Sequence, residues 1–192
     1  MMRMVSAIGI TAVAVALAGT LSGAEVTERK FAPGGTVRLD LAAGDYEIVG
    51  TRDERIRVSW DERGKNPEVT LRTDAEASRA TVRTETPWND GPEIRIELPR
   101  RSNIVVKLSA GDLDIHGLEG SKDVSAHAGD VTIGVGPRDQ YRYVNASVKI
   151  GELNADPFDV KKDGLFRSFE WTGKGSYELR AHLTVGDLTL DR

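Results

Sequence analysis

The stretch LSAGDLDIHG, residues 108–117, decides the fold because its pattern recurs at four other places in the chain. The related stretches are LAAGDYEIVG (41–50), AHAGDVTIGV (126–135), VKIGELNA (148–155) and LTVGDLTL (183–190). In each, apolar residues alternate up to a Gly-acid pair, skip both of its residues, and alternate again beyond it. Alternation with a period of two is typical of a β-strand with one buried face. The sequence therefore predicts strands whose phase slips by one residue at every such glycine.

A phase slip requires the chain to turn or bulge, and glycine suits such a site because it reaches positive φ without a Cβ clash. Two geometries fit the pattern. One is a two-residue type II′ hairpin loop between antiparallel strands. The other is a corner at which a strand bends into another sheet while successive corners stack in parallel. Gly111, Gly129 and Gly151 are separated by 18 and 22 residues, and regular spacing of this size favours stacked repeats.

Residues 1–24 have the features of a secretory signal peptide. Arg3 precedes an apolar run from Val5 to Ala18, and the small residues at 22–24 suit a cleavage site near Ala24. The run is shorter than the roughly 20 apolar residues of a membrane-spanning helix, so we expect cleavage rather than a membrane anchor. The remaining residues 25–192 have the size of a single domain. We therefore predict a periplasmic or extracellular protein.

The composition excludes several classes of site and partner. The chain has no cysteine, which rules out disulfides, thiolate metal sites and attachment of a lipid through cysteine. The formal net charge of −4 gives no electrostatic reason to expect nucleic acid or an anionic membrane as a partner. Stability must therefore come from the apolar core.

The two halves of the chain predict different strand arrangements. From Thr36 to Leu98 short alternating strands are separated by short loops rich in turn residues, which favour antiparallel pairing. The fold class predicted is all-β, an antiparallel meander leading into a short β-solenoid-like stack of Gly-Asp repeats. Residues 156–175 interrupt the rhythm and contain four aromatic residues: Phe158, Phe166, Phe169 and Trp171. We expect them to cap the open end of the core; the alternative is a binding surface.

The residues usually responsible for catalysis are not arranged for it. His116, His127 and His182 fall on the outward phase of their strands, and no nucleophile elbow, phosphate loop or His-Glu-x-x-His motif is present. We therefore predict no catalytic, cofactor-binding or metal-binding residue, no cofactor, and a protein that is not an enzyme.

The acids that follow the glycines occupy equivalent positions: Asp112, Asp130, Glu152 and Asp187. In a parallel stack they would form a ladder with rungs ~4.8 Å apart. The favoured explanation is that each carboxylate accepts hydrogen bonds from the amides of its own turn. The alternative is that the carboxylates form a row of oxygen ligands for calcium.

A second alternative role for the acids is glycoside hydrolysis, which uses a pair of carboxylates. Asp112, Asp114 and Asp130 could lie near one another on one outward face. A solvated charged face is the favoured interpretation, because aspartate and glutamate are abundant throughout the chain.

The chain resembles the bacterial putative-adhesin family, adhesin-like domains of unknown function built from Gly-Asp β-repeats. The matching segments are LDLAAGDYEIVG, IRIELPRRSNIVVKLSAGDLDIHGLEG, SAHAGDVTIGV and GKGSYELRAHLTVGDLTL, in that order. The resemblance implies an exported, non-enzymatic interaction module of the cell surface or periplasm, with an unknown protein or glycan of the cell envelope as partner. An enzyme or binding protein that acts on envelope polysaccharide is the alternative. The rhythm departs from the family pattern between Gly136 and Gly175.

Overall fold

The computed structural model describes residues 24–61, 67–86 and 92–192, so the predicted signal peptide lies, up to Gly23, outside the described residues. The described chain is all-β, with 15 strands in one sheet. It also contains two short 3₁₀ helices, η1 (Arg138–Gln140) and η2 (Asp156–Phe158). No helix in these ranges is both long enough and apolar enough to cross a membrane.

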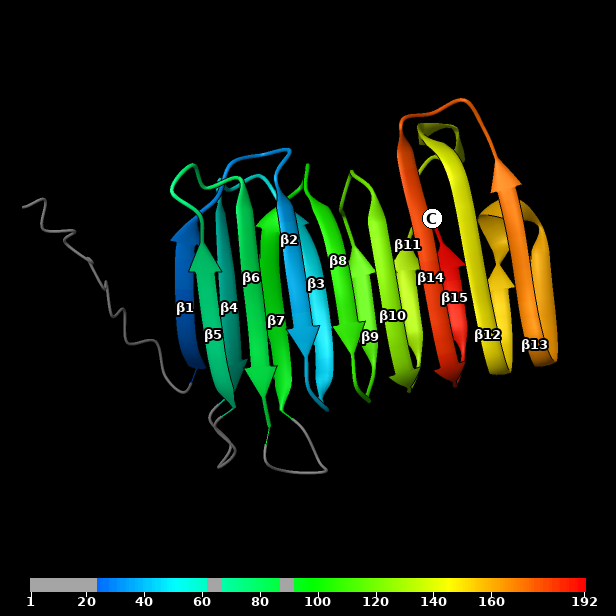
Figure 1. The fold of residues 1–192 in the computed structure, drawn as a ribbon, viewed down its shortest axis with the longest axis horizontal. Coiled ribbons are helices and arrows are strands. Elements are labelled where there is room, and N and C mark those ends of the chain that lie inside the picture. Colours follow the sequence, from blue (N-terminus) through cyan, green and yellow to red (C-terminus); the bar gives the residue numbers. More distant parts are fainter. Residues whose placement is uncertain (1–23, 62–66, 87–91) are drawn as a thin grey trace, which may run out of the picture.

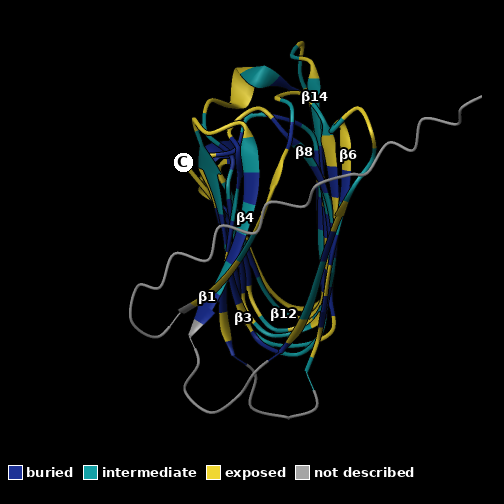
Figure 2. Cartoon of the chain, turned by 90° about the vertical axis from the view of Figure 1, so that its left-hand side faces the viewer, coloured by how far each residue is buried: buried dark blue, intermediate teal, exposed yellow. Residues whose placement is uncertain are grey.

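The sheet folds into two facing layers and is nearly closed, like a barrel (Figures 1 and 2). The strands of the first layer are, in spatial order, β5 (Glu68–Thr73), β6 (Arg79–Glu85), β2 (Thr36–Leu41), β8 (Asn103–Leu108), β10 (Lys122–Ala128) and β14 (Tyr177–Val185). The strands of the second layer are β1 (Ala24–Lys30), β4 (Arg55–Asp61), β7 (Glu93–Pro99), β3 (Asp45–Thr51), β9 (Leu113–His116), β11 (Val131–Gly134) and β15 (Leu188–Asp191).

The long strand β12 (Tyr141–Ala155) belongs to both layers, since its first part pairs with β14 and its last part with β15. Strand β13 (Val160–Thr172) runs antiparallel to β12 at this end of the sheet. At the opposite end β1 and β5 contact each other. The two layers are therefore joined through β12 at one end and approach each other at the other.

The core lies between the layers and consists of the residues that the alternation places inward. Val37, Leu39 and Leu41 are buried, and so are the corresponding residues of the neighbouring strands. Figure 2 shows buried residues in both of the layers that enclose this interior. Full burial of a Val, Leu or Ile side chain contributes about 1.5–3 kcal/mol, so this core is the main source of stability for a cysteine-free chain.

The Gly-acid pairs join the two layers. Strand β8 pairs in parallel with β2 and β10, whereas β9 pairs in parallel with β3 and β11. The strands before and after Gly111-Asp112 therefore lie in different layers, and the hairpin alternative is wrong for this pair. We call these positions the Gly-acid corners. In spatial order they are Gly44-Asp45, Gly111-Asp112, Gly129-Asp130, Gly186-Asp187 and Gly151-Glu152.

Neighbouring corners approach so closely that a side chain at the glycine cannot fit. A Cβ atom on Gly129 would lie 2.0 Å from the carbonyl oxygen of Gly111, and its φ of +120° is also unfavourable for other residues. The same contact recurs one corner further on, where a Cβ on Gly186 would lie 2.0 Å from the oxygen of Gly129. Glycine is therefore required here by both conformation and space.

The predicted antiparallel meander between Thr36 and Leu98 is wrong. Strands β2 and β3 pair in parallel with β6 and β7, respectively, and β7 lies between β3 and β4. Antiparallel pairs in this region are confined, among the described strands, to β1 with β4, β4 with β7, and β5 with β6. The alternation of apolar residues fixes which face of a strand is buried but does not identify its neighbours, and short loops also suit a chain that crosses between layers.

We expect Gly129→Ala to lower the free energy of unfolding by about 3 kcal/mol or more, because the added methyl group collides with the adjacent corner. Gly136→Ala is the matched control, since Gly136 has a φ of +67° but no atom within 4 Å of an added Cβ. It should cost only about 1–2 kcal/mol. Urea unfolding of both variants measures the difference. Equal losses would show that backbone conformation alone explains the glycine.

Candidate functional site

The corner carboxylates form a hydrogen-bonded ladder along the stack. The amide of Asp112 donates to Oδ1 of Asp45 (3.3 Å), and that of Asp130 donates to Oδ1 of Asp112 (3.1 Å). The amide of Asp187 donates to Oδ1 of Asp130 (3.1 Å), and that of Glu152 to Oδ1 of Asp187 (2.9 Å). The donors belong to the adjacent corner rather than to the same turn, which corrects the sequence-based expectation. Each bond is charge-assisted and offsets the repulsion between stacked acids.

The ladder does not gather metal ligands. In residues 24–61, 67–86 and 92–192 no three histidine, aspartate or glutamate side chains come together as a metal ion would require. The carboxylates follow one another along the stack, and those of Asp45, Asp112, Asp130 and Asp187 each direct one oxygen to the amide of the adjacent corner. The calcium alternative has no converging site to support it.

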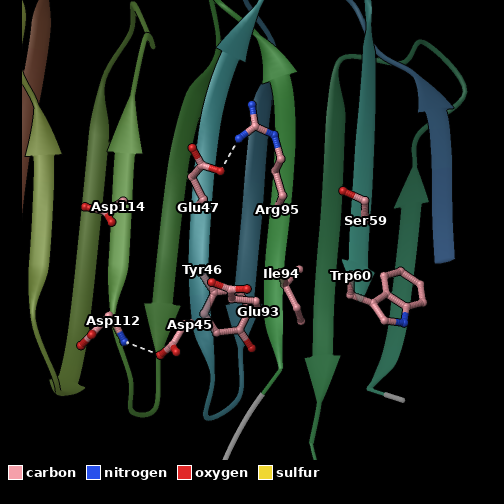
Figure 3. Close-up of a pocket in the computed structure, with 10 residues that line it drawn as sticks. All are labelled: Asp45, Tyr46, Glu47, Ser59, Trp60, Glu93, Ile94, Arg95, Asp112 and Asp114. Carbon is pink, nitrogen blue, oxygen red and sulfur yellow. Dashed lines mark hydrogen bonds and ion pairs between the residues drawn. The ribbon is translucent and has the colours of Figure 1, made fainter. Parts of the chain in front are cut away.

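A hollow of about 390 Å³ lies on the outer face of the second layer, over β9, β3, β7 and β4 (Figure 3). Its carboxylate-bearing residues come from segments far apart in the sequence: Asp45, Glu47, Glu93, Asp112 and Asp114. The pairing of β7 beside β3, and of β3 beside β9, brings these segments together. Tyr46, Ile94 and Trp60 also line the hollow but are themselves buried in the core.

The hollow is negatively charged. Arg95 is the basic residue among its described lining residues, and it forms an ion pair with Glu47. Glu47 also lies 3.3 Å from Nε2 of His116. The other four lining carboxylates, Asp45, Glu93, Asp112 and Asp114, form no ion pair with a described residue, and all four are exposed. The arrangement suits a cationic group, which would gain charge-assisted hydrogen bonds.

The hollow brings together two of the three acids considered for glycoside hydrolysis. Asp112 and Asp114 line it, whereas Asp130 lies one corner further along the stack and is not among the lining residues. A catalytic acid of this kind usually owes its raised pKa to burial, and Asp112 and Asp114 are exposed. The geometry therefore favours binding over hydrolysis.

The three histidines are exposed, as predicted, and they are dispersed. His116 is on β9, His127 on β10 and His182 on β14, so they occupy both layers. Nδ1 of His182 lies 2.7 Å from the hydroxyl of Ser147. No pair of these side chains shares the hollow.

Lys122 is a buried charged residue that the sequence analysis missed. Its side chain is 1% exposed, and Nζ donates to the hydroxyl of Tyr141 (2.7 Å) and to the carbonyl of Leu118 (3.0 Å). Burial lowers the pKa of Lys122 to about 8, an effect that the charge of Glu119 partly offsets. The signal was present in the sequence, because Lys122 falls on the inward phase of the strand that continues through Val124.

Residues 156–175, the segment with four aromatic residues, cap one end of the core. Phe158 packs against Phe169 (ring centroids 5.6 Å apart) and Trp171 (5.2 Å), and both phenylalanines are buried. Phe166 departs from this arrangement, since 78% of it is exposed. The predicted cap is therefore confirmed for three of the four aromatic residues.

Comparison with solved structures shows a related fold. A protein named "putative cell adhesion protein" from Clostridium sporogenes is 14% identical, with 88% of this chain and 99% of that chain covered and a TM-score of 0.55. The likeness shows the fold. A "putative adhesin" from Bacteroides fragilis is 8% identical over 88% of this chain and 98% of that chain, with a TM-score of 0.30, which is too low to indicate the same fold. No protein-family model matches the sequence, and no curated protein is similar to it.

The lowered pKa of Lys122 predicts a specific pH dependence of stability. Below about pH 8 the amine is charged in both the folded and the unfolded chain, and the cost of burying the charge is fully present. Between about pH 8 and the ordinary value of 10.5 the folded chain binds fewer protons than the unfolded one, so stability rises with pH, by up to roughly 3 kcal/mol.

Urea unfolding of the wild type and of Lys122→Met from pH 7 to 10.5 tests this prediction. The wild type should gain stability relative to the variant as the pH rises through this window, because only the wild type carries the buried amine. Parallel curves would show that Lys122 has an ordinary pKa in the folded chain.

Proposed function

We propose that the chain is an exported, non-enzymatic interaction module of the cell surface or periplasm, which holds its partner in the hollow on the second layer. The observation that carries this proposal is the set of five carboxylates that β3, β7, β9 and the Gly111-Asp112 corner present around the hollow. Strand-borne groups are held in place before binding, which lowers the entropic cost of association.

The chemistry of the hollow favours a basic protein segment as the partner. Lysine and arginine side chains form their strongest hydrogen bonds with carboxylates, and a negative patch also steers a cationic partner toward the site. Glu47 and Arg95 are already paired with each other. The remaining carboxylates therefore provide the attraction, and Arg95 disfavours a cation directly above it.

The proposal extends to the family and the repeat. We infer that the five Gly-acid corners are copies of one structural unit in a short β-solenoid-like stack, and that the chain is a member of the bacterial putative-adhesin family. The parallel pairing on both sides of the corners supports the first inference. The fold shared with the Clostridium sporogenes protein supports the second.

An action on envelope polysaccharide is the second candidate function, favoured by one observation. Asp112 and Asp114 lie together in the hollow, and glycoside hydrolysis uses two carboxylates. Their exposure places this candidate behind binding, because neither carboxylate is desolvated as a catalytic acid would be.

We expect the double variant Asp112→Asn with Asp114→Asn to bind an oligolysine peptide at least about tenfold more weakly than the wild type, since two charged contacts of about 1 kcal/mol each are lost. Asparagine keeps the oxygen that Asp112 offers to the amide of Asp130, so the fold should be preserved. Isothermal titration calorimetry at about 0.15 M salt, where the Debye length is about 8 Å, measures the affinity.

The matched control is Asp130→Asn with Asp187→Asn, which removes the same charge from corners outside the hollow. Its affinity should fall by clearly less than that of the first pair, since neither carboxylate lines the hollow and charges outside it are partly screened at about 0.15 M salt. Equal weakening by both pairs would mean that net charge, not the hollow, attracts the peptide. Release of reducing ends from envelope polysaccharide by the wild type, abolished by the first pair, would establish the enzymatic alternative instead.

Export has its own test. When the full sequence is expressed in a bacterial host, the chain should be recovered outside the cytoplasm and begin near Glu25, because a signal peptidase would cut after the small residues that end at Ala24. Cell fractionation followed by N-terminal sequencing measures both properties. A cytoplasmic chain that still begins at Met1 would refute export without affecting the binding proposal.

A further inference from the structure

Strand β13 has one edge without a partner. It pairs with β12 along Val160–Thr172 and with no other described strand. The unpaired amide and carbonyl groups of such an edge are a template for pairing with another chain. Figure 1 shows β13 at one end of the molecule, at the opposite end of the sheet from β1 and β5.

Strand β13 bends at residues 164–166, where Gly164 and Phe166 have positive φ values, and exposed apolar side chains surround this bend. Leu165 is 59% exposed and lies opposite Ile150 (51%), which in turn lies opposite Val185 (43%). Phe166, the next residue of the bend, is 78% exposed. On β10 the residue opposite Val185 is the small Ala128. The apolar side chains in this row across the strands therefore become larger toward the free edge of β13. Large exposed apolar side chains that cluster in this way indicate an interaction surface.

The bend also changes the phase of β13. Before it, Val160 and Lys162 lie opposite the buried Ala155 and Leu153 of β12. After it, the residues opposite buried positions of β12 are Arg167, Phe169 and Trp171. The residues of β13 on the inward side, opposite buried positions of β12, are thus even-numbered before the bend and odd-numbered after it. If two β13 strands pair antiparallel about a two-fold axis between two residues of the bend, even-numbered residues of one copy lie opposite odd-numbered residues of the other. Residues on the inward side of each strand are then opposite one another.

The charges of β13 select one position for that axis. An axis between Leu165 and Phe166 places Lys161 of one copy opposite Glu170 of the other, twice by symmetry. It also places the inward Val160 opposite Trp171. Opposite charges in facing positions stabilise a sheet, whereas like charges destabilise it.

The neighbouring positions of the axis are unfavourable. Moving it one residue toward the amino terminus sets Lys162 opposite Arg167, and moving it one residue the other way sets Asp163 opposite Glu170. Both alternatives oppose like charges across the new pair.

We propose that two copies of this chain associate end to end through antiparallel pairing of their β13 strands, with the two-fold axis between Leu165 and Phe166. A symmetric pair is the simplest occupant, because one surface then provides both sides of the interface. The exposed apolar residues of the two bends meet at the axis, and each layer of one copy continues into the opposite layer of the other. The hollow, over β9, β3, β7 and β4, remains open.

Sedimentation equilibrium of the full chain should show a dimer. Glu170→Lys replaces two attractive pairs by two repulsive ones, so the dissociation constant should rise by roughly tenfold or more. Adding Lys161→Glu to Glu170→Lys exchanges the charges and should return the constant to within about threefold of the wild type. Glu68→Lys, an exposed glutamate on the edge strand β5 at the other end, should leave it unchanged.

Disulfide trapping tests the register without relying on the charges. The chain has no cysteine, so Asp163→Cys and Ser168→Cys can be made as single-cysteine proteins and mixed under oxidation. The proposed register places residues 163 and 168 of different copies opposite each other, with Cβ atoms about 4.5–5.5 Å apart, close to disulfide geometry. The mixed product should exceed both self-paired products, and Glu68→Cys with Ser168→Cys should give none.

A monomer at the highest soluble concentration would overturn the proposal and indicate that Lys161 and Lys162 protect the edge from pairing. A dimer that Glu68→Lys disrupts, or that the charge exchange fails to restore, would place the interface elsewhere. An excess of self-paired disulfides would refute the register. Circular dichroism of each variant verifies the fold, and the trapping experiment remains decisive if Glu170→Lys unfolds the chain.

Discussion

The close contact between successive Gly-acid corners is the constraint on which the rest of the structure depends. The missing side chains of Gly111, Gly129 and Gly186 let each corner sit against the carbonyl group of the one before it. Only at this separation can the amide of each acidic residue reach the carboxylate of the corner before it. The corners thereby fix the spacing of both layers at once, and the apolar side chains of the two layers meet across a single interior.

Much of the fold could be predicted from the sequence because burial follows directly from the alternation of residue types. The inward positions of Val37, Leu39 and Leu41 follow from their spacing. The stacking of the corners was one of two geometries compatible with the phase slip. The neighbours of each strand could not be predicted, since β7 enters between β3 and β4, strands that precede it by more than 30 residues in the chain, and no local pattern encodes such an insertion.

The candidate site was less predictable for the same reason. The acids at Asp112 and Asp114 were identified in the sequence, but Glu47 and Glu93 join them only because β7 and β9 both pair with β3. Lys122 differs, because its inward position within an alternating strand was visible in the sequence. A charged residue in the buried phase of a strand identifies a polar group that must find partners inside the core, here Tyr141 and a backbone carbonyl.

The direction of the corner ladder has a consequence for how such a chain can change in length. In spatial order, each of the corners at Gly111, Gly129 and Gly186 donates an amide to the corner before it and offers a carboxylate oxygen to the corner after it. The segment from Asp112 to Gly129, 18 residues, supplies one full circuit through both layers. Duplication or loss of a whole circuit would leave the remaining junctions of the same kind, whereas insertion or loss of a single residue within a strand would reverse the inner and outer faces of the residues beyond it in that strand. The core therefore accommodates a change in length most easily in steps of one whole circuit.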